Sequence, residues 1–455
     1  MRLEMKLSKI VNPLFKSVLT VTLMVPLLLG LEASVIGVEQ AQAQEAEKPK
    51  RKAKRVETIR AKYVKDFEKI QAAFEIDDHA VVNTILDKLE KVPELNNIER
   101  AYIHNYRGNI CFEADNLKCA LREFKLVTRT REGLSDAFYN QMLYVIAQVY
   151  FSQENYKEAL NYAQIWFKTQ AEPPADAYML IGQAYYMLKN YDAALPNVQN
   201  GIQKYIDLGS VPKEGWLNLL SNIYRQKNDF RKMQPVVKQL VLHYPKKTYL
   251  LTLAGIYNEL DDQQKMTAMY QAMYDQGILT SESEVVTLAS LQMSQDNPFK
   301  ASAIMEKGIS SGAVKTNLKN WRVYAQSLFM AREYEKALGP LENAAKLAKN
   351  GKLYNQLGQS YMALNQWREA ETAIVKAINK GKLGNTGQTV ISLGMVQFEQ
   401  KKYDSAKASF NKALRYDSVA AQAGNWIKYV DNEVYRIREL EKEIIINTDV
   451  EPLTS

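Results

Sequence analysis

The sequence predicts an all-α protein, a right-handed superhelical solenoid of about nine helical hairpins with capping helices at both ends. Three observations predict this fold. The 455 residues are 46% apolar and 24% charged, which is ordinary for a globular chain with a large core. The chain has 13 prolines and short runs of β-branched residues, so strands are not expected. A pattern of small and large residues also recurs roughly every 34 positions.

The recurring pattern has a small residue, a large residue three positions later and a second small residue twelve positions after the first. Gly358, Tyr361 and Ala370 form a clear copy. The first small site falls at residues 108, 147, 182, 221, 254, 289, 325, 358 and 394. A single two-helix unit cannot bury its own apolar face, so the units must stack.

The spacing of the small residues predicts how the two helices of each hairpin pack. We expect the first small site, on helix A, to meet the second small site, on helix B. An aromatic residue at the start of helix B, such as Tyr191 or Trp367, is expected to close the far end of the hairpin. The residue four positions past the second small site, for example Ile374, is expected to reach the next hairpin. Polar breaks such as residues 189–190 mark the turns.

These residues carry a resemblance to the tetratricopeptide repeat (TPR), whose motif has the same small, large and small positions. The resemblance covers residues 100–415. Residues 56–99 are expected to form an additional helix pair that closes the N-terminal end. Residues 416–445 read as a long amphipathic helix that covers the last repeat, as the end of a solenoid requires. Residues 446–455 are expected to be a disordered tail.

The first 43 residues form a separate segment that we expect to be a secretory signal peptide. Four basic residues precede an apolar run at residues 18–31, and residues 41–43 read Ala-Gln-Ala. This order is typical of a signal that is cleaved after its small residues, here near Ala43. The alternative is a retained membrane anchor, although the apolar run is shorter than the roughly 20 residues of a spanning helix.

A basic leader is expected at residues 44–55, between the signal peptide and the first helix. The chain carries a net charge of +8, which is spread out except for the run from Lys48 to Arg55. This run suits weak contact with an anionic membrane surface or an acidic partner. The alternative is a solvated, flexible leader.

The sequence contains no pattern of catalytic or cofactor-binding residues. Its three histidines, His79, His104 and His243, are not spaced with cysteines or carboxylates as metal ligands would be. Phosphate-binding glycine loops and nucleophile motifs are absent from the sequence. We therefore expect a non-enzyme with no cofactor, no metal and no nucleic-acid partner.

Two cysteines, Cys111 and Cys119, flank the expected turn of the first clear hairpin. An exported chain meets an oxidising compartment, so we expect a disulfide that joins the two helices across a short loop. The alternative is a pair of small buried residues that do not meet.

The resemblance implies that helix A of each hairpin lines a concave groove where partners bind. The residues expected to face it lie three before, one after and four after the first small site. Many are amides, which offer a peptide backbone a donor and an acceptor together, and others are aromatic. They are Asn105, Asn109, Phe112, Tyr144, Gln148, Phe151, Gln183, Tyr186, Asn222, Arg225, Arg322, Gln326, Phe329, Asn355, Gln359 and Met362. The alternative is a concave surface that is polar without binding a partner.

The whole layout is similar to the periplasmic TPR proteins associated with TonB–ExbB–ExbD energy-transduction systems of Gram-negative bacteria. The layout comprises the signal peptide, the basic leader, the run beginning RVETIRAKYVKDFEKIQ, nine degenerate repeats and a long capping helix. This resemblance implies a periplasmic protein-binding scaffold for outer-membrane uptake, of iron chelates or similar cargo, with TonB, ExbB or ExbD as partners. Two alternatives stay open: a scaffold for cell-envelope assembly, in outer-membrane protein insertion or peptidoglycan synthesis control, and a TPR accessory of polysaccharide export.

Overall fold

The computed structural model describes residues 56–448, with side chains described as far as Lys442. The signal peptide expected at 1–43 and the basic leader expected at 44–55 lie outside the described residues, as does most of the tail expected at 446–455. Close contacts divide the chain into two compact units. Unit 1 ends at Tyr244 and unit 2 begins at Pro245.

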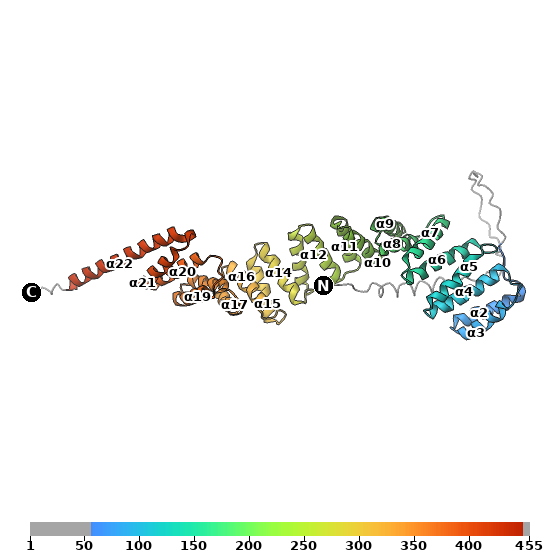
Figure 1. Ribbon diagram of the computed structural model, residues 1–455, viewed down its shortest axis with the longest axis horizontal. Helices are drawn as coiled ribbons and strands as arrows, with labels where there is room; N and C mark the ends of the chain where they lie inside the picture. The colour runs from blue at the N-terminus through green and yellow to red at the C-terminus, as the bar shows by residue number, and fades with distance from the viewer. Residues whose placement is uncertain (1–55, 449–455) are drawn as a thin grey trace, which may run out of the picture. The chain divides into compact units, whose positions relative to one another are not determined.

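The described part of unit 1 consists of ten helices, coloured from blue to green in Figure 1. They are α2 (Ala61–Glu75), α3 (His79–Glu90), α4 (Asn97–Glu113), α5 (Leu117–Arg129), α6 (Asp136–Ser152), α7 (Tyr156–Thr169), α8 (Ala175–Met187), α9 (Tyr191–Asp207), α10 (Glu214–Gln226) and α11 (Phe230–His243).

The described part of unit 2 runs from yellow-green to red in Figure 1. Its helices are α12 (Lys247–Glu259), α13 (Gln263–Asp275), α14 (Glu282–Ser294), α15 (Pro298–Ser310), α16 (Leu318–Met330), α17 (Tyr334–Leu347), α18 (Lys352–Ala363), α19 (Trp367–Lys380), α20 (Thr386–Glu399), α21 (Tyr403–Ala413), the 3₁₀ turn η1 (Asp417–Val419) and α22 (Ala420–Thr448).

Consecutive helices pack in pairs, as the repeat predicts. The most extensive contacts join α8 with α9, α4 with α5 and α18 with α19, the two helices of single hairpins. From α4 to α21 the helices form nine such hairpins. Residues 56–448 contain one isolated bridge, between Val56 and Gly133, and no strand. The predicted all-α fold of stacked hairpins is confirmed.

Each of the nine hairpins turns on one residue in the left-handed backbone region. In α6–α7 this residue is Glu154, with a φ of 59°, and in α8–α9 it is Lys189, with a φ of 61°. In five of the nine hairpins the side chain of the next residue caps helix B. For example, the Asn155 side chain accepts from the backbone of Glu158, and Asn190 does the same for Ala193. The cap supplies a bond that the first turn of a helix lacks, which fixes the short loop.

The helix-B residue that lies nearest the glycine of helix A is not the one expected. An added Cβ on Gly358 would lie 2.5 Å from Ile374 Cγ1, which is closer than real Cβ atoms come, whereas Ala370 is not among its nearest atoms. The same geometry recurs at the other glycine sites. The pairs are Gly108 with Phe124, Gly182 with Val198, Gly358 with Ile374 and Gly394 with Phe410. The residue that was expected to reach the next hairpin therefore also packs against the glycine of its own hairpin. The expected contact is present as well, because Ile374 shares an apolar cluster with Val396 of α20.

Side-chain hydrogen bonds join helix B of one hairpin to helix A of the next. The acceptor or donor on helix A is the large residue three positions after the first small site, which was expected only to pack. The bonds are Gln164 Nε2 to Tyr185 Oη (2.8 Å), Gln199 Nε2 to Tyr224 Oη (2.9 Å) and Gln292 Nε2 to Gln271 Oε1 (2.8 Å). These directional bonds fix the register between neighbouring hairpins.

The N-terminal helices α2 and α3 pack on α4 through an apolar cluster that includes the buried Phe67, Ile70 and Leu86. A charged contact reinforces this packing, because Arg60 donates from its backbone and its guanidinium to the fully buried Glu99. Burial alone would raise the pKa of Glu99, but these bonds outweigh it and lower the pKa.

At the C-terminal end α22 covers the last hairpin. Its Trp426 ring stacks on Phe410 with centroids 5.3 Å apart, and Val430 is fully buried. Further along the helix, Tyr435 and Leu440 are exposed. α22 has 29 residues, but within residues 56–448 no helix has both the length and the hydropathy needed to cross a membrane.

Helix α14 begins with a capping box that depends on an ionised carboxylate. Ser281 and Glu284 exchange side-chain-to-backbone hydrogen bonds, and Lys247 of α12 lies 2.8 Å from Glu284 Oε2. Burial alone would raise the pKa of Glu284. The bonds from Lys247, Ser281 and Thr280 outweigh burial and lower the pKa to about 2.

We predict that Gly358→Ala destabilises the protein by roughly 1–3 kcal/mol, because the new methyl group would overlap Ile374 in a filled contact. The matched control is Gly255→Ala in α12, where an added Cβ meets nothing within 4 Å. That change should be neutral or stabilise by up to about 1 kcal/mol through helix propensity. Urea unfolding followed by far-UV circular dichroism measures both. Equal effects of the two substitutions would refute the packing explanation.

We predict that Glu284→Gln removes up to about 3 kcal/mol of stability near neutral pH. The folded pKa is about 2, which lies below the ordinary glutamate value of 4.5, so the stabilisation is complete above pH 4.5 and is lost as the pH falls towards 2. Unfolding curves of the wild type and the variant should therefore converge near pH 2. If the difference in unfolding free energy between the wild type and the variant stays constant from pH 4.5 to pH 2, the stabilisation does not depend on ionisation of Glu284.

Candidate functional site

The residues expected to face a partner lie on helix A of six hairpins, four in unit 1 and two in unit 2. They fall on α4, α6, α8 and α10 in unit 1 and on α16 and α18 in unit 2. These residues differ in solvent accessibility: some side chains are buried between helices, and others are at least partly exposed.

The residues nearest the N-terminus are buried. Asn105 is 8% exposed, Asn109 is 3%, Gln148 is 4% and Phe151 is 5%. The side-chain oxygens of Asn105 and Asn109 have no hydrogen-bond partner among the described residues. This part of the expected groove, on α4 and α6, therefore offers a partner little surface, although the sequence placed a dense group of groove residues there.

Contacts with Tyr144 explain why the Gln148 side chain is not accessible to a partner. Its ring centroid lies 4.4 Å from that of Trp166 on α7. Burial, with a smaller effect of Asp176, raises the pKa of Tyr144 to about 12, and its hydroxyl is hydrogen-bonded to Gln148. Gln148 is therefore engaged by Tyr144 on its own helix, and Trp166 of the same hairpin packs against the Tyr144 ring.

An open set of residues lies on α8 and α10, two A helices that contact each other directly. Gln183, Tyr186 and Asn222 are half-buried, and Arg225 is exposed. Burial raises the pKa of Tyr186, and the positive charge of Arg225 on the next A helix partly opposes this rise. These two side chains are therefore electrostatic neighbours across the hairpins.

A second open set lies on α16 and α18 in unit 2. Arg322 is exposed, and the remaining members are half-buried: Gln326, Phe329, Asn355, Gln359 and Met362. The Asn355 side-chain oxygen is buried and has no hydrogen-bond partner among the described residues. Each A helix of this set therefore presents at least one amide that solvent or a partner can reach.

The aromatic residues four positions after the first small site have a structural contact that was not foreseen. Each packs against the first residue of helix B in its own hairpin. The ring pairs are Phe151 with Tyr156 (5.1 Å), Tyr186 with Tyr191 (5.6 Å) and Phe329 with Tyr334 (5.7 Å). Phe112 on α4 is half-buried against the core of unit 1. These rings help to close the hairpin ends and leave only part of their area to a partner.

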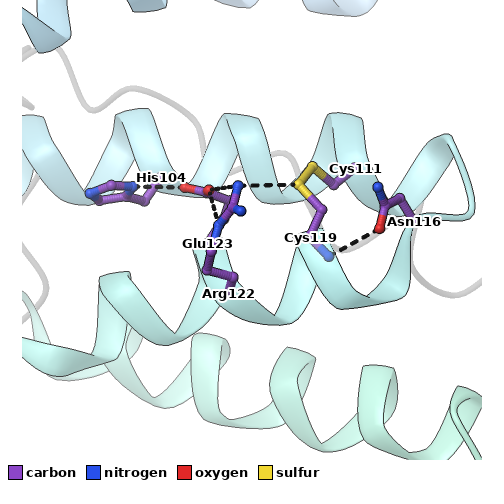
Figure 2. The surroundings of a disulfide bond; sticks show 6 residues. All are labelled: His104, Cys111, Asn116, Cys119, Arg122 and Glu123. Carbon is purple, nitrogen blue, oxygen red and sulfur yellow. Dashed lines mark hydrogen bonds and ion pairs between the residues drawn. A yellow bond between two sulfur atoms is a disulfide. The ribbon is translucent and has the colours of Figure 1, made fainter.

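Cys111 of α4 and Cys119 of α5 form a disulfide with an S–S distance of 2.02 Å (Figure 2). Beside it, His104 Nδ1 lies 2.9 Å from Glu123 Oε2, and Arg122 Nη2 lies 2.8 Å from Glu123 Oε1. The bond from His104 is the main cause that lowers the pKa of the buried Glu123. The disulfide and the contact between His104 and Glu123 both join α4 to α5 in the first repeat.

A hollow of about 220 Å³ in unit 2 was not foreseen from the sequence. Side chains of α17, α18 and α19 line it, among them Glu342, Tyr361 and Arg368. Burial raises the pKa of Tyr361, with contributions from Glu342 and Glu369. From the sequence, Tyr361 was expected only as the large residue of its repeat copy.

Two segments of the chain match family models of the tetratricopeptide repeat. The first match covers residues 144–204, from α6 to α9, and the second covers residues 388–419, from α20 to η1. The helical hairpins in these two segments therefore match the tetratricopeptide repeat.

Solved structures similar to the chain include other repeat proteins. A tetratricopeptide repeat protein from Parabacteroides merdae is 11% identical, with 66% of this chain and 99% of that chain covered and a TM-score of 0.33. YrrB, described as a TPR protein with an unusual peptide-binding site, is 14% identical, with coverages of 42% and 91% and a TM-score of 0.33. The Naa15/Naa10 complex bound to HypK-THB gives 11% identity, coverages of 74% and 55% and a TM-score of 0.43. No curated protein matches the chain.

We predict that replacing both Cys111 and Cys119 with serine lowers the stability of the first repeat by about 2–3 kcal/mol, because the open chain regains loop entropy. Hydrogen exchange followed by mass spectrometry should show faster exchange in α4 and α5. Exchange in α18 and α19 of unit 2 serves as the internal control and should not change. Unchanged exchange in α4 and α5 would show that the disulfide adds nothing to their stability.

Proposed function

We propose that this chain is a non-catalytic scaffold that binds an extended peptide or protein segment along the A helices of each unit. The observation that carries the proposal is the accessible amides on these helices. They are Gln183 and Asn222 in unit 1 and Gln326, Asn355 and Gln359 in unit 2. An amide presents a donor and an acceptor together, which matches the N–H and C=O of a peptide backbone.

The burial pattern narrows this proposal to two sets of residues. The residues of α4 and α6 that are closed between helices contribute to stability rather than to binding, because their side chains have little accessible surface. The open sets on α8 with α10 and on α16 with α18 each add one exposed guanidinium, Arg225 or Arg322. A partner segment with acidic residues near an exposed backbone fits both sets.

We further propose that the scaffold acts in the periplasm as an accessory of the TonB energy-transduction system, in the outer-membrane uptake of iron chelates or similar cargo. The support is the sequence layout: a signal-like segment near the start, a basic leader and a degenerate TPR array that ends in a long helix. TonB, ExbB or ExbD would then supply the bound segment. The basic run from Lys48 to Arg55 would add weak contact with a membrane surface.

Site-specific photocrosslinking in the native cell envelope tests this proposal. The photoreactive residue replaces Gln183 in unit 1 or Gln326 in unit 2. Matched controls replace Gln239 on α11 and Asn343 on α17, which are exposed amides on B helices. We predict that the A-helix positions capture a partner and that the controls do not, because the partner lies along helix A.

The identity of the captured protein separates the alternatives. Recovery of TonB, ExbB or ExbD supports the uptake role. Recovery of an outer-membrane insertion factor, a peptidoglycan synthesis factor or a polysaccharide-export protein contradicts that role and leaves the scaffold proposal intact. Equal capture at the control positions, or no capture at Gln183 and Gln326, contradicts the scaffold proposal itself.

A further inference from the structure

Three possible metal-ligating side chains meet where the N-terminal helix pair packs on the first repeat. Asp77 lies in the turn between α2 and α3, His79 is the first residue of α3, and Glu113 is the last residue of α4. One ligand atom from each residue lies within 4.8 Å of the other two. The sequence separates His79 from Glu113 by most of α3 and all of α4, so spacing along the chain did not reveal this cluster.

Neighbouring contacts fix the positions of Asp77 and His79. Asp77 occupies the left-handed backbone region with a φ of 58°, and Asp78 caps α3 by accepting from Val81 N at 3.1 Å. The His79 ring packs 5.7 Å from that of Phe74, which also packs 5.5 Å from Tyr106 on α4. The backbone and the aromatic packing therefore hold the cluster together without an ion.

One nitrogen of the cluster lacks a hydrogen-bond partner. His79 Nε2 lies 3.0 Å from Glu113 Oε2, yet it is buried and makes no hydrogen bond of acceptable geometry. Within residues 56–448, no lysine or arginine forms an ion pair with Asp77 or Glu113. Two carboxylates thus lie beside one imidazole, with one ligand atom from each residue available to a shared ion.

We propose that Asp77, His79 and Glu113 bind a divalent first-row transition-metal ion, with Zn²⁺ as the representative. Zinc binds carboxylate oxygen and histidine nitrogen at about 2.0–2.2 Å, so two ligands on one tetrahedral ion lie roughly 3.3 Å apart. The separation of 3.0 Å between His79 Nε2 and Glu113 Oε2 is close to that distance. Asp77 and Glu113 are exposed, so an ion has access from solvent and a small movement of the Asp77 side chain completes the set.

The bound ion would neutralise the two carboxylates and join three chain elements. It would link the turn before α3 and the start of α3 to the end of α4. Three protein ligands leave at least one position on the ion for water or for a donor from a partner. This inference stands apart from the proposed peptide binding, because the residues of the cluster are not among the groove residues.

The test is isothermal titration of ZnCl₂ into the tag-free chain after treatment with a chelator. We expect one saturable site, and Asp77→Asn should weaken binding at least about 10-fold. Asparagine also tolerates the left-handed backbone, so the substitution removes the charged ligand without straining the turn. The matched control is Asp261→Asn, in a turn residue of unit 2 that also has a φ of 58° and should bind as the wild type does.

A second pair of variants uses the histidines. His79→Gln should weaken Zn²⁺ binding at least about 10-fold, and His243→Gln, at the exposed end of α11, should leave it unchanged. Co²⁺ absorbance gives an independent readout, because loss of the imidazole ligand changes the spectrum of the bound ion. The proposal is overturned if the wild type shows no saturable binding at millimolar Zn²⁺, or if Asp77→Asn and His79→Gln both bind as the wild type does.

Discussion

The packing of helix B against a small residue on helix A holds each hairpin together, and it is closest in the four hairpins where that residue is glycine. At Gly358 the backbone of α18 comes so close to α19 that Ile374 occupies the space of a Cβ atom. The neighbouring glycine hairpins use Phe124, Val198 or Phe410 in the same way, and all three are fully buried. This contact sets the distance between the two helices. It also directs the outer residues of helix B towards the next hairpin, where the glutamine bonds fix the register.

The periodicity of the sequence was sufficient to predict the helices, the nine hairpins and the turns between them, because small residues and polar breaks recur at fixed distances. It did not identify the packing partner of each glycine, since Ala370 and Ile374 lie one turn apart on the same helix and both positions are apolar in the repeat. The hydrogen bond of Tyr185 was missed for a related reason. The sequence shows that a large side chain occupies this position, but it does not show where the tyrosine hydroxyl points.

The position of a candidate binding residue in the repeat does not determine whether its side chain is accessible. Gln148 and Gln183 occupy the same position in consecutive hairpins, yet Gln148 is buried beside Tyr144 and Gln183 remains accessible. Two local contacts accompany the burial of Gln148: the Tyr144 hydroxyl is hydrogen-bonded to Gln148, and Trp166 of the same hairpin packs against the Tyr144 ring. Accessibility is a property of the stack, so one repeat copy does not determine it. The cluster of Asp77, His79 and Glu113 likewise exists only because three helix ends converge.

Hydroxyl-radical footprinting of the purified chain tests the central packing claim most directly, because it reads the accessibility of individual side chains in solution. The account predicts that Phe124 and Phe410, both 0% exposed, resist oxidation under native conditions. Phe299 and Tyr435, which are 62% and 66% exposed, should be oxidised readily in the same sample. Oxidation of Phe124 and Phe410 at the rate of Phe299 would show that these residues do not fill the glycine contacts and would contradict the account.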